Sequence, residues 1–165
     1  MDYEKVIHNI APVYDENSKV LVLGSFPSPK SRTFGFFYGH PQNRFWKVLS
    51  SVLKCEQPAG IQEKKDMLLS YGIALWDVLE SCEIKGAADS SIKDPKPNDL
   101  DIIFNKADIK AVFMTGKTAY RYYEKFFGSK YQVPFFVLPS PSSANCANFT
   151  VDMLIDEYSK MLEYI

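Results

Sequence analysis

The sequence predicts an α/β protein: a three-layer α/β/α sandwich with a central, mostly parallel four-stranded sheet. Four short apolar runs, each closed by a turn or polar residue, are typical of buried parallel strands. Helical patterns separate these runs, and such alternation favours a parallel sheet with helices on both faces. The predicted strands are residues 19–23, 72–76, 111–115 and 134–138.

The helices are predicted from apolar spacing and from residues that start or stop a helix. Asn43 stands where the first pattern begins, in an N-cap position. Gly72 follows the second pattern as a C-cap, and Thr150 precedes an amphipathic C-terminal pattern as an N-cap. The predicted helices are residues 43–53, residues 62–71, a segment capped by Asn98 or Asp99 that reaches residue 104, residues 117–127, and residues 151–162.

Composition and charge predict one globular domain over residues 1–165. There is no internal repeat, low-complexity tract or linker-like stretch. The net charge is −1, so overall charge does not indicate a nucleic-acid partner. Residues 19–54, however, hold six Lys or Arg and no Asp or Glu. This stretch fits a local phosphate-binding surface, and a chance block of solvated charge is the alternative.

Cysteine usage and the N-terminus predict a reduced, intracellular protein without a cofactor. Cys55, Cys82 and Cys146 are widely spaced and form no metal-binding pair. The first residues carry no apolar signal segment, and no apolar run is long enough to span a membrane. We therefore expect a cytoplasmic location, nucleoid-associated in a prokaryote, and no metal.

Two loops at the carboxyl ends of the predicted strands, residues 24–42 and 139–149, are too long to be simple connections. Ligands of parallel α/β sheets bind at this edge. The first loop holds Ser and Pro residues, then three consecutive aromatics at residues 36–38; the second is uncharged and rich in Ser and Pro. Small hydroxyl-bearing residues suit phosphate, and an aromatic ring suits stacking on a base. Asp77 ends the second strand, so we expect it in the same cleft, as a general base or a structural acceptor.

Three motifs in these regions carry a resemblance. They are Gly-Ser-Phe-Pro-Ser at residues 24–28, Gly-His-Pro-Gln-Asn-Arg-Phe-Trp at residues 39–46, and Leu-Pro-Ser-Pro-Ser-Ser-Ala-Asn at residues 138–145. In order and position they resemble the signature regions of the uracil-DNA glycosylase superfamily. The second motif is similar to mismatch-specific uracil and thymine glycosylases. The combination of all three more closely resembles the hypoxanthine-DNA (deoxyinosine) glycosylase branch.

The resemblance also implies site residues. Many superfamily members carry a water-positioning Asn or Asp where Phe26 stands here, which puts uracil removal in doubt; in the hypoxanthine branch the Asn of the second motif, here Asn43, takes the catalytic role. Tyr38 would stack on the base, with Phe26 and Asn145 also at the base. His40 could be an acid, a base or a structural donor. The residues expected to contact DNA are Ser28, Arg44, Ser140, Ser142, Ser143 and Ala144.

The predicted activity is hydrolysis of the N-glycosidic bond of a deaminated base flipped out of DNA, with hypoxanthine favoured. We expect damaged DNA as the partner, no membrane, and a monomer. Three alternatives stay open: uracil or thymine removal from mismatches, a non-catalytic nucleic-acid-binding module, and a hydrolase of free nucleosides.

Overall fold

The central feature of the protein is the predicted parallel sheet, seen in a computed structural model that describes residues 2–86 and 88–165. Its strands are β2 (Val20–Gly24), β3 (Ile73–Asp77), β6 (Ala111–Thr115) and β7 (Phe135–Leu138). They run parallel in the order β3-β2-β6-β7. The carboxyl ends of all four strands therefore lie along one edge, where ligands of such sheets bind.

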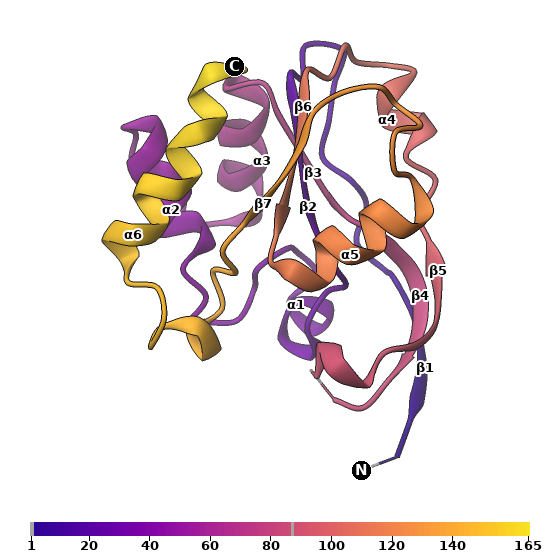
Figure 1. Ribbon diagram of the computed structural model, residues 1–165. Coiled ribbons are helices and arrows are strands. Elements are labelled where there is room, and N and C mark those ends of the chain that lie inside the picture. Colours follow the sequence, from indigo (N-terminus) through magenta and orange to yellow (C-terminus); the bar gives the residue numbers. More distant parts are fainter. Residues whose placement is uncertain (1, 87) are drawn as a thin grey trace.

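The helices cover both faces of this sheet. The α-helices are α1 (Pro29–Phe34), α2 (Phe45–Leu53), α3 (Ile61–Ser70), α4 (Asp101–Phe104), α5 (Lys117–Phe126) and α6 (Val151–Tyr158). Short 3₁₀ segments are η1 (Asp89–Ser91), η2 (Ser143–Asn145) and η3 (Ser159–Glu163). Helices α2, α3 and α6 group on one side of the sheet and α5 lies on the other (Figure 1). The predicted three-layer α/β/α architecture is thus confirmed.

The predicted capping residues are confirmed at one helix and wrong at another. Thr150 caps α6, since its hydroxyl accepts a hydrogen bond from the backbone N–H of Met153 at 3.3 Å. Neither Asn98 nor Asp99 is the N-cap of α4, which is a single turn preceded by Leu100. The Asn98 amide instead donates to the backbone carbonyls that flank the end of β3, because this buried amide needs acceptors.

A second sheet, absent from the sequence prediction, packs beside the first. It is three-stranded and antiparallel, in the order β1-β4-β5, and its strands are β1 (Glu4–Ile7), β4 (Leu79–Ile84) and β5 (Lys93–Pro97). Strand β4 begins two residues after β3 ends, so the chain passes directly from one sheet to the other. This connection brings the segment that follows β1 to the carboxyl end of β3.

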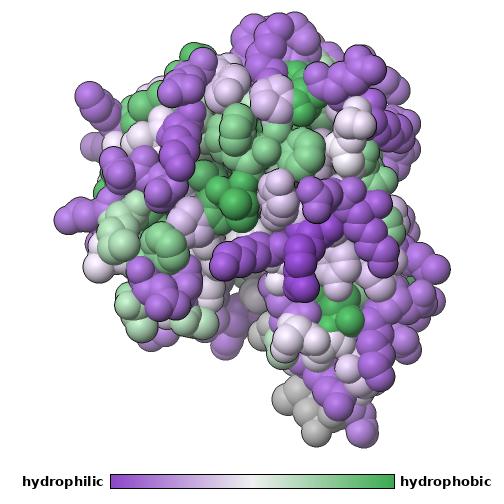
Figure 2. Space-filling view, in the orientation of Figure 1, coloured by the Kyte–Doolittle hydropathy of each residue, from purple (hydrophilic) through white to green (hydrophobic). Residues whose placement is uncertain are grey.

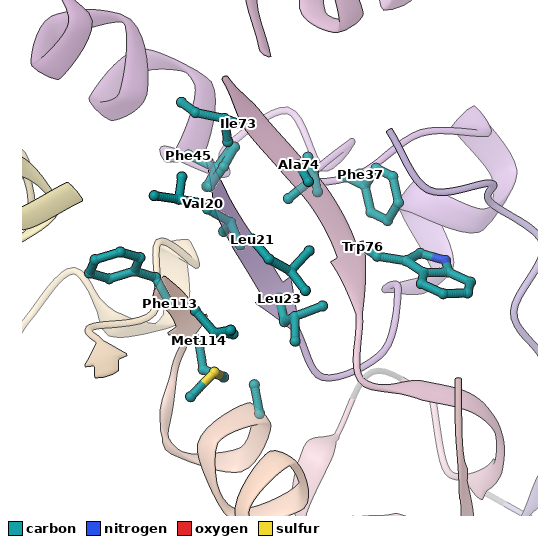
Figure 3. Close-up of a cluster of buried hydrophobic side chains, with 14 of the residues drawn as sticks. Val20, Leu21, Leu23, Phe37, Phe45, Ile73, Ala74, Trp76, Phe113 and Met114 are labelled. Atoms are coloured by element: carbon teal, nitrogen blue, oxygen red, sulfur yellow. The ribbon is translucent and has the colours of Figure 1, made fainter. Parts of the chain in front are cut away.

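The core is built from strands β2, β3 and β6 of the parallel sheet and the aromatics packed on them. Every residue of β2, β3 and β6 is buried. Figure 3 shows Leu21 and Leu23 of β2 between side chains of the neighbouring strands and Phe45. Each fully buried side chain of this size contributes about 1.5–3 kcal/mol by leaving water. A rigid sheet of this kind can hold the strand-end residues in fixed positions.

The surface in Figure 2 has an apolar area near the centre of the view, bordered by hydrophilic residues. Strand β7 runs through this part of the molecule in Figure 1, and it is an edge strand that exposes Phe136 and Val137. In the described part of the chain, no helix has both the length and the apolar character needed to cross a membrane.

Candidate functional site

A cleft opens at the carboxyl ends of β2, β3 and β6, where both long loops meet. Nine of the twelve predicted site residues line it: Phe26, Ser28, Tyr38, His40, Asn43, Asp77, Ser140, Ser142 and Ser143. Three others, Arg44, Ala144 and Asn145, do not line it. The cleft wall also includes residues that sequence reasoning missed, among them Ser25, Asp89 and Thr115.

The first loop is ordered by a short helix that the sequence analysis did not predict. Ser28 caps α1, its hydroxyl accepting from the backbone N–H of Ser31 at 3.1 Å, and Pro29 occupies the first helical turn. The hydroxyl of Ser31 in turn accepts from the backbone N–H of Gly39 at 2.9 Å. A Cβ on Gly39 would lie only 3.0–3.2 Å from Phe34 and Ser31, so glycine allows this close approach. These contacts fix the segment that carries Tyr38 and His40.

Tyr38 is held in place from two sides. Its ring stacks on Phe45 with centroids 4.0 Å apart and planes 11° apart, and its hydroxyl shares a 2.7 Å hydrogen bond with Thr115. Burial raises the pKa of this phenol far above its usual value, so the ring stays neutral at physiological pH. Tyr38 also has a left-handed backbone, with φ of 53°, which is unusual for a non-glycine residue and often marks a functional position. Phe45 covers one ring face, and Tyr38 also lines the cleft.

Asn43 is oriented by the start of helix α2. The N-cap residue is Arg44, so the prediction of Asn43 as the N-cap is wrong by one position. The Asn43 side chain still serves the helix end, because its carbonyl Oδ1 accepts from the backbone N–H of Phe45 at 2.9 Å. With Oδ1 turned to the helix, the Nδ2 group of Asn43 is the end of the amide that can donate a hydrogen bond into the cleft. His40 lies nearby, with Nδ1 accepting from the backbone N–H of Gln42 at 3.1 Å.

Arg44 joins the two loops. Its guanidinium donates to the backbone carbonyls of Pro141 at 3.3 Å, Ser142 at 2.9 Å and Phe149, all in the second loop. Its backbone N–H donates to Pro141 as well, at 3.0 Å. Three of the five guanidinium N–H groups are therefore used inside the protein. Contact of Arg44 with DNA stays a prediction, while its contacts within the protein make it a link between the two walls of the cleft.

The second loop is a series of short turns closed by its own side chains. The hydroxyl of Ser140 accepts from the backbone N–H of Ser142, and that of Ser142 accepts from the N–H of Ala144, both at 3.2 Å. The amide of Asn145 donates to the Ser140 carbonyl at 3.1 Å, which uses it inside the loop rather than in the cleft. Each Ser hydroxyl that accepts a backbone hydrogen bond keeps its own O–H free to donate outward.

The floor of the cleft holds a buried hydrogen-bonded pair that includes a residue missed from the sequence. His8, in the segment after β1, places Nε2 2.8 Å from Oδ2 of Asp77, and both side chains are almost fully buried. His8 is 69 residues away from Asp77 and directly follows β1, a strand that was not predicted. The expectation that Asp77 lies in the cleft agrees with its position there.

A second carboxylate, that of Asp89, stands at the rim. It accepts from the hydroxyl of Ser25 at 3.3 Å. The residue as a whole is exposed, but the carboxyl group itself lies among protein atoms. This desolvation raises the pKa of Asp89, and the charge of Asp77 raises it further, while the bond from Ser25 opposes the shift. Across residues 2–86 and 88–165, His, Cys, Asp and Glu side chains form no group of three or more suited to a metal ion.

Comparison with known proteins gives one consistent result. A family model described as the uracil DNA glycosylase superfamily matches residues 11–164. Two curated relatives are both named hypoxanthine DNA glycosylase. The protein from Methanosarcina barkeri is 35% identical over 136 residues, which cover 81% of this chain and 85% of the relative. The protein from Methanosarcina acetivorans is 33% identical over 135 residues, which cover 81% of this chain and 84% of the relative.

A solved structure agrees with these matches. A solution NMR structure from Methanosarcina acetivorans, which bears a provisional uracil DNA glycosylase name, superposes with a TM-score of 0.80 at 27% identity. The superposition covers 94% of this chain and 98% of that one. The similarity therefore extends over almost the whole fold.

Proposed function

The chain belongs to the uracil-DNA glycosylase superfamily and is a monofunctional DNA glycosylase, and we propose that the base it removes is hypoxanthine, the product of adenine deamination. The observation that carries this choice is the polar character of the cleft. Asn43 and Tyr38 line it together. The apolar Phe26 also lines it, at the position of the first motif where many superfamily members have a polar residue. The two relatives named hypoxanthine DNA glycosylase support the same choice.

In this proposal the damaged nucleotide first leaves the DNA stack and enters the cleft. Hypoxanthine pairs poorly with the thymine that stood opposite the original adenine, so its extrusion costs less than that of a normal base. The free face of Tyr38 receives the base, and Phe45 behind it keeps the ring from turning away. Stacking of a base on an aromatic ring contributes about 1–3 kcal/mol.

Asn43 then acts by positioning. The bond between C1′ of the sugar and N9 of the purine breaks, its electron pair goes to the base, and the sugar becomes cationic. A water molecule adds its oxygen to C1′ and releases a proton, and the departing base gains one. An amide is too weak a base to remove the water's proton early, but its Nδ2 and the remaining lone pair of Oδ1 can orient water against C1′. We assign this role to Asn43 because its amide is already fixed by the Phe45 N–H.

The second loop would hold the DNA backbone. The outward O–H groups of Ser140 and Ser142 can donate to phosphate oxygens, and Ser143 lines the cleft beside them. Ser28 would meet the phosphate on the opposite wall. The exposed Ala144 is small enough to approach the gap left by the flipped nucleotide.

We propose that one chain is sufficient for this work, because both loops of the cleft come from the same chain. Sedimentation of the protein with and without a duplex would test the monomer. A species with two chains on one lesion would contradict it.

The test is release of free base from matched duplexes that carry hypoxanthine, uracil, xanthine or a thymine opposite guanine. The measurement is single-turnover, with enzyme in excess, so that the rate reports chemistry rather than product release. We expect hypoxanthine to be released fastest and excess chelator to leave the rate unchanged. Faster release of uracil or thymine would move the assignment to the mismatch-specific group.

Two further substrates separate the remaining alternatives. Free inosine should be a far poorer substrate than the same base in DNA, because it has no phosphate groups for the second loop to bind. Faster hydrolysis of free inosine would favour a nucleoside hydrolase. Tight binding to all duplexes without any released base would favour a non-catalytic binding module.

A further inference from the structure

The buried pair of His8 and Asp77 has a defined proton arrangement. The Nδ1 atom of His8 accepts from the backbone N–H of Ile10 at 3.2 Å, so the ring proton is on Nε2. Nε2–H then donates to Oδ2 of Asp77 at 2.8 Å. The His8 ring cannot swing away, because it packs edge-on against Phe26 and Trp76, with centroids 5.9 and 6.3 Å apart. His8 therefore fixes which oxygen of Asp77 faces inward and which faces the cleft.

The second oxygen, Oδ1 of Asp77, lies over the carboxyl end of β2. Residue 24 pairs with residue 77 in the parallel sheet, and a Cβ on Gly24 would stand 2.4 Å from this oxygen. The same Cβ would stand 3.3 Å from the hydroxyl of Tyr38, so Oδ1 lies next to the stacking residue. The Asn98 amide holds the Asp77 backbone at 2.9 Å. Asp77 therefore presents Oδ1 beside Tyr38 in the cleft, while His8 binds its other oxygen and Asn98 binds its backbone carbonyl.

Deamination changes the base edge in a way that this acceptor can detect. In adenine the ring atom N1 has a lone pair, and after deamination to hypoxanthine N1 carries a hydrogen beside a carbonyl group. A carboxylate oxygen accepts hydrogen bonds and cannot donate them. It attracts an N–H and repels a lone pair.

We propose that Asp77 reads the N1–H of the deaminated purine through Oδ1, and that His8 is the positioning residue that keeps Oδ1 turned toward the base. The inference rests on the proposed function, and it identifies N1–H as the group that distinguishes hypoxanthine from adenine. His8 precedes residues 11–164, the part of the chain that the family model matches, so this half of the pair lies outside that match. A site built to hydrogen-bond an N–H discriminates strongly against an analogue that lacks it, because the buried acceptor is then left unpaired.

The first test changes one atom of the substrate and leaves the protein intact. Duplexes carry hypoxanthine or 1-deazahypoxanthine, which has C–H in place of N1–H and keeps the carbonyl oxygen in its N3–H tautomer, on a 2′-fluoro sugar that resists hydrolysis. We expect wild-type protein to bind the deaza duplex at least about 100-fold more weakly. Equal affinity for the two duplexes would overturn the proposal.

The second test changes the acceptor. In Asp77→Asn the His8 Nε2–H selects the side-chain oxygen, so the amide NH₂ faces the base as a donor. The variant should lose its preference for hypoxanthine over adenine, and the ratio of the two affinities should fall by at least about 100-fold. Asp66→Asn, an exposed carboxylate on α3, is the matched control for the loss of charge and should leave the ratio unchanged. An unaltered ratio in folded Asp77→Asn would contradict the proposal.

The third test separates positioning from stability. Gln can place its NH₂ near the position of His Nε2, so His8→Gln should keep most of the hypoxanthine preference and His8→Leu should lose it. A purely structural His8 would lower the melting temperature in both variants and leave the ratio of affinities intact. If wild type releases no base from any duplex, the proposed function fails; if wild type is active but these ratios do not move, this inference alone fails.

Discussion

Replacing Arg44 by Met should loosen the second loop and slow base release. The substitution keeps the apolar stem of the side chain and removes the guanidinium, which donates to the carbonyls of Pro141, Ser142 and Phe149. A hydrogen bond from a charged donor contributes about 1.5–3 kcal/mol when buried and less where water can replace it. The site is half-buried, so the three bonds together should contribute about 2–3 kcal/mol to the free energy of unfolding.

The assay combines stability with local exchange. Urea unfolding gives the change in free energy, and amide hydrogen exchange over residues 142–149 shows whether the loop opens separately. Single-turnover release should fall about 10- to 100-fold, because the wall that carries Ser140 and Ser142 is no longer held against Asn43. Arg44→Lys should recover only part of the loss, since an ammonium cannot reach three acceptors at once.

Lys47→Met is the matched control, because it removes an exposed cation from the same helix, α2. It should leave stability and loop exchange close to those of the wild type. Unchanged exchange over the loop in Arg44→Met, together with wild-type stability, would refute the idea that Arg44 links the two loops.

The remaining predictions concern three positions. Tyr38→Phe should keep most of the single-turnover rate because the stacking ring remains, whereas Tyr38→Leu should lose about 10- to 100-fold, the equivalent of one base stack; equal rates in the two variants would argue against stacking. Gly24→Ala should lower both the melting temperature and the release rate, because the new Cβ would stand 2.4 Å from Asp77 Oδ1; a wild-type melting temperature would show that this oxygen moves freely. In the described part of the chain the Tyr123 hydroxyl is buried without a hydrogen-bond partner, so Tyr123→Phe should raise the free energy of unfolding by about 1 kcal/mol. Burial raises the pKa of Tyr123 to about 12 from 10.0, so the unfolded state ionises first and stability should fall between about pH 10 and pH 12, less steeply in Tyr123→Phe; equal slopes for the two proteins in urea unfolding at several pH values would contradict this.

Most of the parallel sheet could be predicted because its signal is local. The inner strands are continuous apolar runs, and the structure places β6 at the same bounds that its run of residues predicts. The antiparallel sheet has no such signal. Strand β5 reads Lys-Asp-Pro-Lys-Pro, a composition that disfavours strands, and it forms only because it pairs with β4 at the surface.

Part of the candidate site could also be predicted, because its signals too are local in the sequence. Asp77 follows from the rule that strand ends face the ligand, Asn43 from the second motif, and Tyr38 from its place directly before that motif. The partner of Asp77 could not be found in this way, since His8 approaches from 69 residues away, just after the unpredicted strand β1. The role of Arg44 inside the protein was equally hidden, because its acceptors are backbone carbonyls, which every residue carries.

The start of helix α2 shows how a small shift matters. The sequence places Asn43 at the N-cap, whereas the helix begins at Phe45 and Arg44 is the cap residue. The physical need was correctly identified, because an Asn oxygen does accept from the first turn. The hydrogen bond from the Phe45 N–H turns Oδ1 toward the helix, and this gives the Asn43 amide its defined orientation.

The most direct test of the central claim is single-turnover release of hypoxanthine by wild type, Asn43→Ala and Asn43→Ser. Ser replaces the oxygen that accepts from Phe45 N–H and lacks the amide NH₂, so it separates helix capping, which costs about 1 kcal/mol when lost, from chemistry. We predict that both variants stay folded by circular dichroism, that Asn43→Ser is the more stable, and that both lose most base release. Near-wild-type release by Asn43→Ser would show that the Asn43 amide only caps the helix, and the assignment of Asn43 as the catalytic residue would be wrong.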